Sequence, residues 1–259
     1  MLARMQRPSA QWLWLVPPFL FGMAYLDRVE GFVDGRDARR APVGLAPDPG
    51  TTAEPVVQVY AARAVRWRGY FGVHTWVSVK PRDATEFTTY EVNGWRLRRT
   101  GSAVSIDHRS PDARWFGNRP DLIAEQRGEG VNELIARIEQ AVDAYPYADT
   151  YRVWPGPNSN TFVAHVLRAV PELRADLPAT AIGKDYLGPG FVAWSPSGTG
   201  AQLNLFGVVG ALAGVEEGVE LNVLGLTFGV DPLDLSFKLP LAGRLGWPRP
   251  RAMSAADET

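Results

Sequence analysis

Residues 71–80 (FGVHTWVSVK) alternate between two sets of side chains with a strict period of two. Val73 and Val77 fall in one set, and His74 and Trp76 fall in the other. Because successive side chains of a β-strand point to opposite faces of its sheet, this pattern predicts a strand. His74 is therefore expected on the face of the sheet opposite the valines.

The segments around this strand either repeat the strand pattern or change to helical spacing. Residues 56–64 and 87–100 are predicted to be strands, the second with a turn at its Asn-Gly pair. Apolar residues then recur at helical spacing in 119–126, 130–145 and 161–170, which predicts helices. The expected fold class is α+β, with a small antiparallel sheet packed on helices.

After residue 178 the chain consists of short apolar runs separated by glycines. Two of these runs are hydrophobic enough for membrane spans, but Glu216, Glu217, Glu220 and Asp231 interrupt them. Charged residues are costly inside a bilayer, so additional C-terminal strands and loops are favoured over spans. The acidic residues match no known cation-binding loop, and we expect neither a metal ion nor a cofactor.

The N-terminal segment has the composition of a secretory signal or a membrane anchor. Arg4 and Arg7 precede residues 12–26, which carry no charge. This run is shorter than the roughly 20 apolar residues of a full span, and Pro17 and Pro18 would kink it. We expect an uncleaved hydrophobic helix that anchors the chain in a bacterial inner membrane, with the rest on the periplasmic side. The alternative is a buried amphipathic N-terminal helix.

These patterns divide the chain into an anchor segment (1–26), an extended linker (27–55), one globular domain (56–247) and a flexible tail (248–259). Two properties of the whole chain exclude classes of function. The net charge of −1 gives no electrostatic basis for binding nucleic acid. The absence of cysteine excludes disulfides, thiolate metal sites and thiol nucleophiles.

Residues 154–170 (WPGPNSNTFVAHVLRAV) join a proline-containing turn to the start of a helix. Asn158, Ser159 and Asn160 are all favoured helix N-cap residues, so capping alone explains their polarity. At about 100° per residue, however, Ser159 falls about 60° from Phe162, within the apolar face of the helix. An inward hydroxyl at the positive end of a helix dipole is also the geometry of an activated nucleophile. Both interpretations remain open from the residues alone.

The motifs GVHTWVSV, YEVNGW and NSNTF resemble the circularly permuted papain-like superfamily, which includes PPPDE-type peptidases and permuted NlpC-type amidases. In that superfamily a strand histidine precedes a helix that starts with a sequence like N-C-N-x-F. Longer stretches, among them VVQVYAARAVRWRGYFGVHTWVSVKP and LPATAIGKDYLG, resemble the bacterial family named domain of unknown function 3750, over residues 56–247. The resemblance implies a permuted papain-like core.

The superfamily resemblance implies catalytic roles for particular residues. His74 would be the general base, and Ser159 would occupy the position of the nucleophilic cysteine, with Asn158 beside a developing oxyanion. Glu91, on the next predicted strand, is our candidate for the residue that orients His74. Serine has a far higher pKa than cysteine, so a reaction at this position needs a stronger base and a better oxyanion site.

Further side chains are candidates for binding a substrate in the same cleft. Asn160 follows the nucleophile position, and Trp76 and Trp154 could line a groove, although tryptophans are more often found in cores. Three hypotheses result. The domain is a degenerate hydrolase that binds a peptide, glycan or lipid of the cell envelope, an active serine-variant amidase or peptidase, or an envelope scaffold without a cleft.

Overall fold

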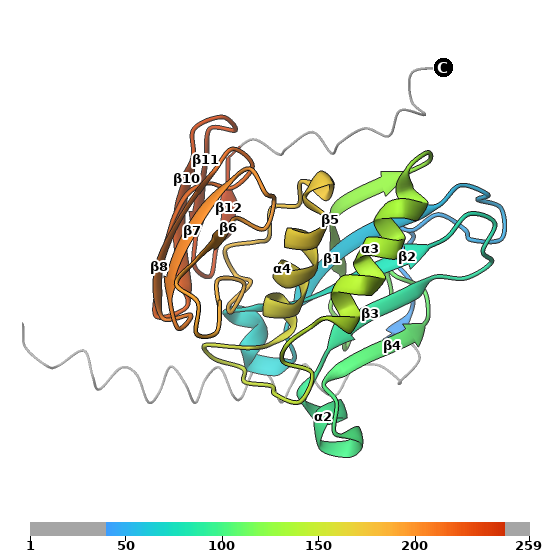
Figure 1. Cartoon of the computed structure of the whole chain (residues 1–259), viewed down its shortest axis with the longest axis horizontal. Helices are drawn as coiled ribbons and strands as arrows, with labels where there is room; N and C mark the ends of the chain where they lie inside the picture. Colours follow the sequence, from blue (N-terminus) through green and yellow to red (C-terminus); the bar gives the residue numbers. More distant parts are fainter. Residues whose placement is uncertain (1–39, 247–259) are drawn as a thin grey trace, which may run out of the picture.

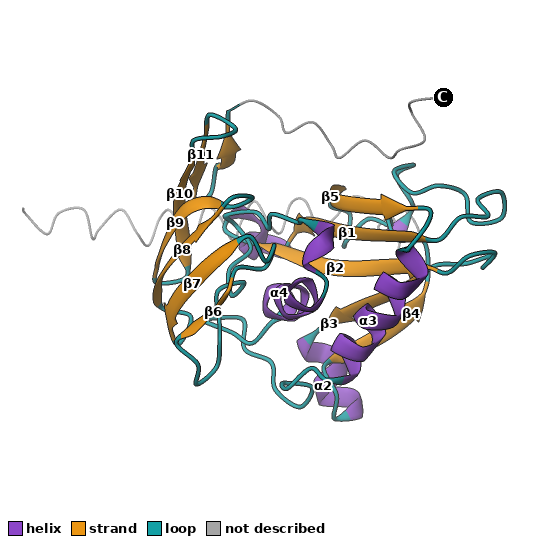
Figure 2. Ribbon diagram, turned by 45° about the horizontal axis from the view of Figure 1, so that its top comes forward, coloured by secondary structure: helices purple, strands orange, loops and turns teal. Residues whose placement is uncertain are grey.

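A computed structural model describes residues 40–246 and contains two antiparallel sheets that stand side by side (Figure 1). The first sheet has five strands in the order β4-β3-β2-β1-β5. The second has seven strands in the order β12-β11-β10-β9-β8-β7-β6, a meander in which each strand pairs with its neighbour along the chain. Helix α4 lies between the two sheets (Figure 2).

The strands of the five-stranded sheet come from the first half of the chain. They are β1 (Val56–Arg63), β2 (Val73–Lys80), β3 (Thr88–Val92), β4 (Val104–His108) and β5 (Pro120–Arg127). The strand predicted from the alternation in residues 71–80 is therefore confirmed. It pairs with β1 on one side, His74 lying opposite Ala62, and with β3 on the other.

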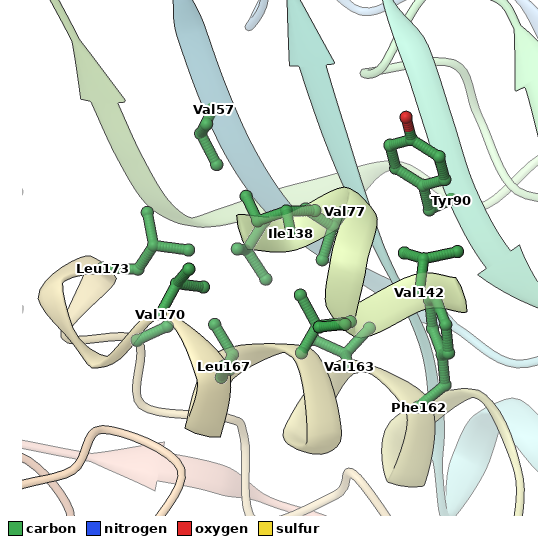
Figure 3. Packing of buried hydrophobic residues seen from close by; sticks show 14 of the residues in the cluster. Val57, Val77, Tyr90, Ile138, Val142, Phe162, Val163, Leu167, Val170 and Leu173 are labelled. Carbon is green, nitrogen blue, oxygen red and sulfur yellow. The ribbon is translucent and has the colours of Figure 1, made fainter. Parts of the chain in front are cut away.

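Helices α3 (Val131–Asp143) and α4 (Ser159–Ala169) cover one face of this sheet. Val57 and Val77 of the sheet pack against Ile138 of α3 and against Phe162 and its apolar neighbours on α4 (Figure 3). All of these side chains are fully buried. The helical spacing in residues 130–145 and 161–170 correctly predicted this apolar layer.

Loops rather than helices cover the other face of the five-stranded sheet. Asp112 accepts hydrogen bonds from the backbone N–H groups of Val43, Leu45 and Ala46, which holds residues 43–46 against the loop that follows β4. Tyr60, Trp76 and Trp115 form a second, smaller apolar cluster beneath these loops. Residues 43–46 of the predicted linker therefore pack against the sheet.

The seven-stranded sheet contains the short apolar runs of the C-terminal sequence. Its strands are β6 (Val192–Trp194), β7 (Gly200–Leu205), β8 (Val209–Gly214), β9 (Gly218–Val223), β10 (Leu226–Asp231), β11 (Ser236–Leu239) and β12 (Gly243–Leu245). Buried and exposed side chains alternate along β7, β9 and β11. One face of this sheet is turned toward α4, and the other faces away from the rest of the described chain (Figure 2).

The expected α+β fold, with one small sheet packed on helices, is wrong. The described chain is mostly β, because residues 192–245 form a complete second sheet rather than a few extra strands and loops. The helix expected at residues 119–126 is the edge strand β5, where pairing with β1 decides the structure and an initial proline is tolerated.

The strand expected at residues 87–100 ends early. Only β3 is extended, and the remainder is the short helix α2 (Gly94–Thr100), because the Asn93 side chain caps it by accepting a hydrogen bond from the N–H group of Arg96. The expected N-terminal hydrophobic helix and the C-terminal tail lie outside the described residues. Within residues 40–246, no helix combines the length and hydrophobicity needed to cross a bilayer.

Candidate functional site

The polar run at the start of α4 is tied to the surrounding backbone. The Oδ1 atom of Asn158 accepts hydrogen bonds from the N–H groups of Asn160 (2.9 Å) and Thr161 (3.2 Å). Its Nδ2 atom donates to the carbonyl oxygens of Val153 (3.1 Å) and Ile182 (2.9 Å). Asn158 therefore uses both its acceptor and its donors in capping and in holding a neighbouring loop. The side-chain amide predicted to stabilise an oxyanion is already engaged.

Ser159 and Asn160 join the start of α4 to β2. The Thr75 hydroxyl lies within hydrogen-bonding distance of the Ser159 carbonyl oxygen (3.2 Å) and of Asn160 Oδ1 (3.0 Å). Asn160 Nδ2 donates to the carbonyl oxygens of Val73 (3.1 Å) and Ile182 (2.8 Å). Ser159 itself is buried, as its position on the helix predicted. These contacts hold the start of α4 against strand β2.

His74 forms part of a buried charged group on the opposite face of the sheet. Its Nε2 atom lies 3.0 Å from Oε2 of Glu91, and the Arg109 guanidinium lies 3.3 Å from the same oxygen. Burial alone would raise the pKa of Glu91, but His74 and Arg109 outweigh it and hold that pKa below its ordinary value. The proposed orienting partner of His74 therefore contacts it.

The structure does not bring His74 and Ser159 together. Thr75 points toward α4 and contacts Ser159, so the alternation of β2 directs the neighbouring His74 to the other face. There the His74 ring stacks on Trp115, with ring centroids 3.7 Å apart and planes 7° apart. Within the described residues His74 has a hydrogen bond to Glu91 and none to Ser159. A helix-wheel argument placed Ser159 correctly relative to its helix, but it carried no information about which face of the sheet that helix covers.

The aromatic rings around His74 form a continuous group that reaches the surface. We call Trp95, Trp115 and Phe116 the aromatic shelf. Trp115 is nearly buried, whereas Trp95 and Phe116 are about two-fifths exposed, at 39% and 41%. Their ring centroids lie 5.7 Å and 5.1 Å from that of Trp115. Trp115 and Phe116 lie in the loop-rich passage after β4, where the sequence shows no periodicity that would have indicated a site.

The tryptophans predicted to line a groove lie in two different regions. Trp76 is completely buried; its Nε1–H donates to the Pro111 carbonyl oxygen (2.8 Å) and Arg109 lies over its ring. It therefore supports the shelf from below and cannot contact a ligand. Trp154 is half-exposed, but its Nε1–H donates to the Leu224 carbonyl oxygen (2.9 Å), which places it beside the seven-stranded sheet.

A second charged group, whose contacts between distant segments the sequence did not predict, lies between the two sheets. Lys184 contacts Asp185 and Glu220, and Lys238 contacts Glu220 (2.7 Å) and Asp176 (2.6 Å). Burial would lower the pKa of Lys184, but the two carboxylates outweigh it and raise that pKa above its ordinary value. The rarity of lysine in the sequence was the signal that could have drawn attention to this charged group.

The chain has three lysines against a large excess of arginine, and all three, Lys80 included, are buried. The ammonium group of lysine is a compact point charge, and those of Lys184 and Lys238 each contact two carboxylates. Glu220, one of the acidic residues that interrupt the C-terminal apolar runs, is one of these carboxylates. Among the described residues, no group of three or more histidine, aspartate or glutamate side chains could hold a metal ion.

A comparison with known protein families finds a match to the five-stranded region. A family model described as a protein of unknown function (DUF3750) matches residues 54–186. The chain belongs to this family. The match spans the five-stranded sheet, helices α2 to α4 and the NSNTF motif, and it ends before β6. Neither the curated proteins nor the solved structures contain a significant match. The likeness to the papain-like superfamily stays a prediction.

Proposed function

We propose that this DUF3750 protein is a non-catalytic binding module of the bacterial cell envelope and that the aromatic shelf is its ligand-binding surface. The observation that carries the proposal is the series of ring contacts from the buried His74–Glu91 pair through Trp115, which stacks on His74, to Trp95 and Phe116, which are about two-fifths exposed. Rings held from below by other rings keep their position without a ligand, which lowers the entropic cost of binding.

The chemistry of the shelf favours a sugar-bearing ligand over the peptide and lipid alternatives. A pyranose ring presents C–H groups on its faces and hydroxyls around its edge, which matches flat indole rings beside hydrogen-bonding groups. Arg109 remains partly exposed next to the shelf and can donate to such hydroxyls. Envelope glycans are therefore the ligand class that we propose.

The alternative hypothesis, a serine-variant amidase or peptidase, lacks its central contact. A general base must lie within hydrogen-bonding distance of the group whose proton it removes, about 2.6–3.2 Å between heavy atoms, or act through one water. His74 is instead paired with Glu91 and stacked on Trp115, and the polar groups beside Ser159 bond the backbone. The Ser159→Cys variant tests this hypothesis directly. We expect a thiol that reacts with iodoacetamide no faster than an ordinary buried cysteine, and a rapid reaction that His74→Ala abolishes would restore the hydrolase hypothesis.

Ligand binding can be tested on the full-length protein with chitotetraose and a soluble muropeptide. Titration calorimetry should detect binding to the wild type, and the Trp95→Ala/Phe116→Ala double variant should bind at least about tenfold more weakly. Trp67→Ala is the matched control, because Trp67 is 47% exposed, no less than Trp95 and Phe116, but lies in the 3₁₀ helix η3 (Arg66–Tyr70). An equal loss in the control, or no binding by the wild type, would contradict the proposal.

The location in the envelope is proposed on the composition of the N-terminal segment alone. Basic residues followed by an uncharged run favour an inner-membrane anchor with the folded region on the periplasmic side. Fractionation of a tagged full-length chain tests this, since the tag should sediment with membranes and be accessible to protease from the periplasm. A soluble cytoplasmic pool would be the contrary result.

A further inference from the structure

The outer face of the seven-stranded sheet is apolar and exposed. Its side chains belong to alternate positions of successive strands, and the exposed fraction of each of the following lies between 44% and 69%. They are Val192, Leu203, Leu221, Val223, Phe228 and Phe237. Soluble proteins scatter exposed apolar residues singly, whereas a continuous apolar surface indicates an interaction site.

The polar residues of the same strands all point the other way. The charged residues within the strands, Glu220, Asp231, Lys238 and Arg244, form ion pairs on the inner side. Gln202 continues this pattern by hydrogen bonding to Asp185 and Arg168. The sheet is thus inverted relative to a sheet in water, because its polar face is buried and its apolar face is exposed.

The turns at both ends extend the apolar surface beyond the face of the sheet. Phe206, Leu224, Leu235 and Leu241 are each at least 57% exposed. All four also have left-handed backbone conformations, with φ between 46° and 68°. Glycine, asparagine or aspartate is preferred at such positions, and a bulky apolar residue there carries a conformational cost. Neither turn formation nor solubility explains these residues, so we attribute them to contact with an external apolar partner.

The size and shape of this surface restrict what can cover it. Seven strands spaced about 4.8 Å apart and up to six residues long span about 30 Å by 20 Å, or about 600 Å². A second copy packed face to face would bury about 600 Å² per partner, or about 1,200 Å² in total, which is at the lower end of a standard interface. Two strongly twisted sheets also touch over only part of their faces, and the apolar turns would remain in water.

Residues 12–26 of the chain are also too small to be the sole cover. Fifteen residues of helix measure about 22 Å by 10 Å, which would cover at most two or three strands. A fluid hydrocarbon phase adapts to a twisted face and surrounds its turns at both ends. We therefore infer that the outer face of the seven-stranded sheet inserts into the surface of a lipid bilayer.

The charges around the face indicate the kind of binding. No lysine or arginine points outward from the strands of this sheet, and in the turn after β8 Glu217 is buried and accepts hydrogen bonds from Ser197. Attraction to anionic headgroups requires clustered basic residues, so burial of apolar area supplies the affinity here. Binding is expected to be as tight to phosphatidylcholine vesicles as to vesicles that also contain phosphatidylglycerol, and to change little with salt.

The absence of native cysteine allows a site-specific test on the full-length protein. A single cysteine at Leu221→Cys, in the centre of the outer face, is labelled with the environment-sensitive fluorophore NBD. A matched label at Glu133→Cys, on the exposed side of α3, is the control. Adding either type of vesicle should shift the emission of the Leu221 label to the blue and increase it several-fold, while the control label stays unchanged.

A charged variant gives a second, independent readout. The Leu221→Lys/Phe237→Lys pair places charges on the face without changing a buried residue, and the NBD response of a label at Leu203→Cys should then fall at least about tenfold. Vesicle binding through the N-terminal segment alone would sediment the chain without any response at Leu221, which would overturn the inference. A blue shift that appears without vesicles and grows with protein concentration would show that a second copy covers the face, and would overturn it as well.

Discussion

The two sheets of this protein bury opposite kinds of side chain, apolar in the five-stranded sheet and polar in the seven-stranded sheet. The five-stranded sheet buries valines against apolar residues of α3 and α4, as in most soluble domains (Figure 3). The seven-stranded sheet turns its polar face inward and joins it to the rest of the chain through ion pairs. Since the same alternation of apolar and polar residues occurs in both, the alternation does not specify which set faces the protein interior. The surroundings of each sheet decide that.

The difference predicts that the two regions respond to different substitutions. The free energy of unfolding should depend on side-chain volume in the core of the five-stranded sheet. It should depend on paired charges on the inner face of the seven-stranded sheet. Apolar residues on the outer face of the second sheet should contribute almost nothing to folding, since their partner is external.

The largest effect is expected where two buried lysines between the sheets lose a shared carboxylate. Glu220→Ala leaves Lys184 paired with Asp185 alone and Lys238 paired with Asp176 alone, and breaking buried ion pairs in this way costs about 3–5 kcal/mol. Denaturant unfolding of the full-length protein measures this. The control Glu133→Ala removes an exposed carboxylate and should change stability by less than about 0.5 kcal/mol. Equal effects would show that the ion pairs are unimportant.

The next comparison makes the same leucine-to-alanine substitution in the core beside the five-stranded sheet and on the outer face of the seven-stranded sheet. Leu167→Ala, on α4 against the five-stranded sheet, should cost about 2–5 kcal/mol because it leaves a cavity in a buried core. Leu221→Ala, on the outer face, should change the free energy of unfolding by less than about 0.5 kcal/mol. A cost at Leu221 similar to that at Leu167 would mean that the outer face is covered within the folded protein.

A smaller effect is expected at the start of α4. Asn158→Ala removes an N-cap and the donor to the Val153 carbonyl oxygen, while the Ile182 carbonyl oxygen keeps its hydrogen bond from Asn160, so a loss of about 1–2 kcal/mol follows. Asn93→Ala removes the cap of the shorter, more exposed α2 and should cost less. If Asn158 instead served catalysis rather than capping, its replacement would leave the unfolding midpoint unchanged.

The smallest effect concerns the pH dependence contributed by Glu91. Its pKa is lower in the folded state than the ordinary value of 4.5, so its contribution to stability is fully present above that value and is lost as the pH falls through the lowered pKa. The difference in stability between the wild type and Glu91→Gln should therefore be constant near neutral pH and shrink in acid. Urea unfolding over that range measures it, and a difference that grows in acid would have the wrong sign.

The sequence predicted local structure better than it predicted arrangement. The alternation in β2 and the helical spacing of α3 and α4 are determined by nearest neighbours along one element, so they can be deduced from the residues. Strand β5 and helix α2 depend on pairing and capping, and these short segments were predicted wrongly.

The candidate site could be predicted only in part, for a related reason. The pairing of His74 with Glu91 follows from neighbouring strands and was anticipated. The separation of His74 from Ser159 depends on which face of the sheet α4 covers, and no periodicity within α4 encodes that face. Trp115, Phe116 and the lysine pairs lie in segments whose positions are set by long-range contacts.

The inversion of the seven-stranded sheet is the central claim, and cysteine accessibility tests it most directly. Leu221→Cys on β9 and Leu212→Cys on the adjacent β8 are made singly in the full-length chain and treated with a bulky hydrophilic maleimide in aqueous buffer. Leu221 is 55% exposed and Leu212 is 3% exposed. The Leu221 thiol should react nearly as fast as in the unfolded chain, and the Leu212 thiol at least about a hundredfold more slowly, because it becomes accessible only when the sheet opens. Equal rates, or protection at Leu221, would contradict the account.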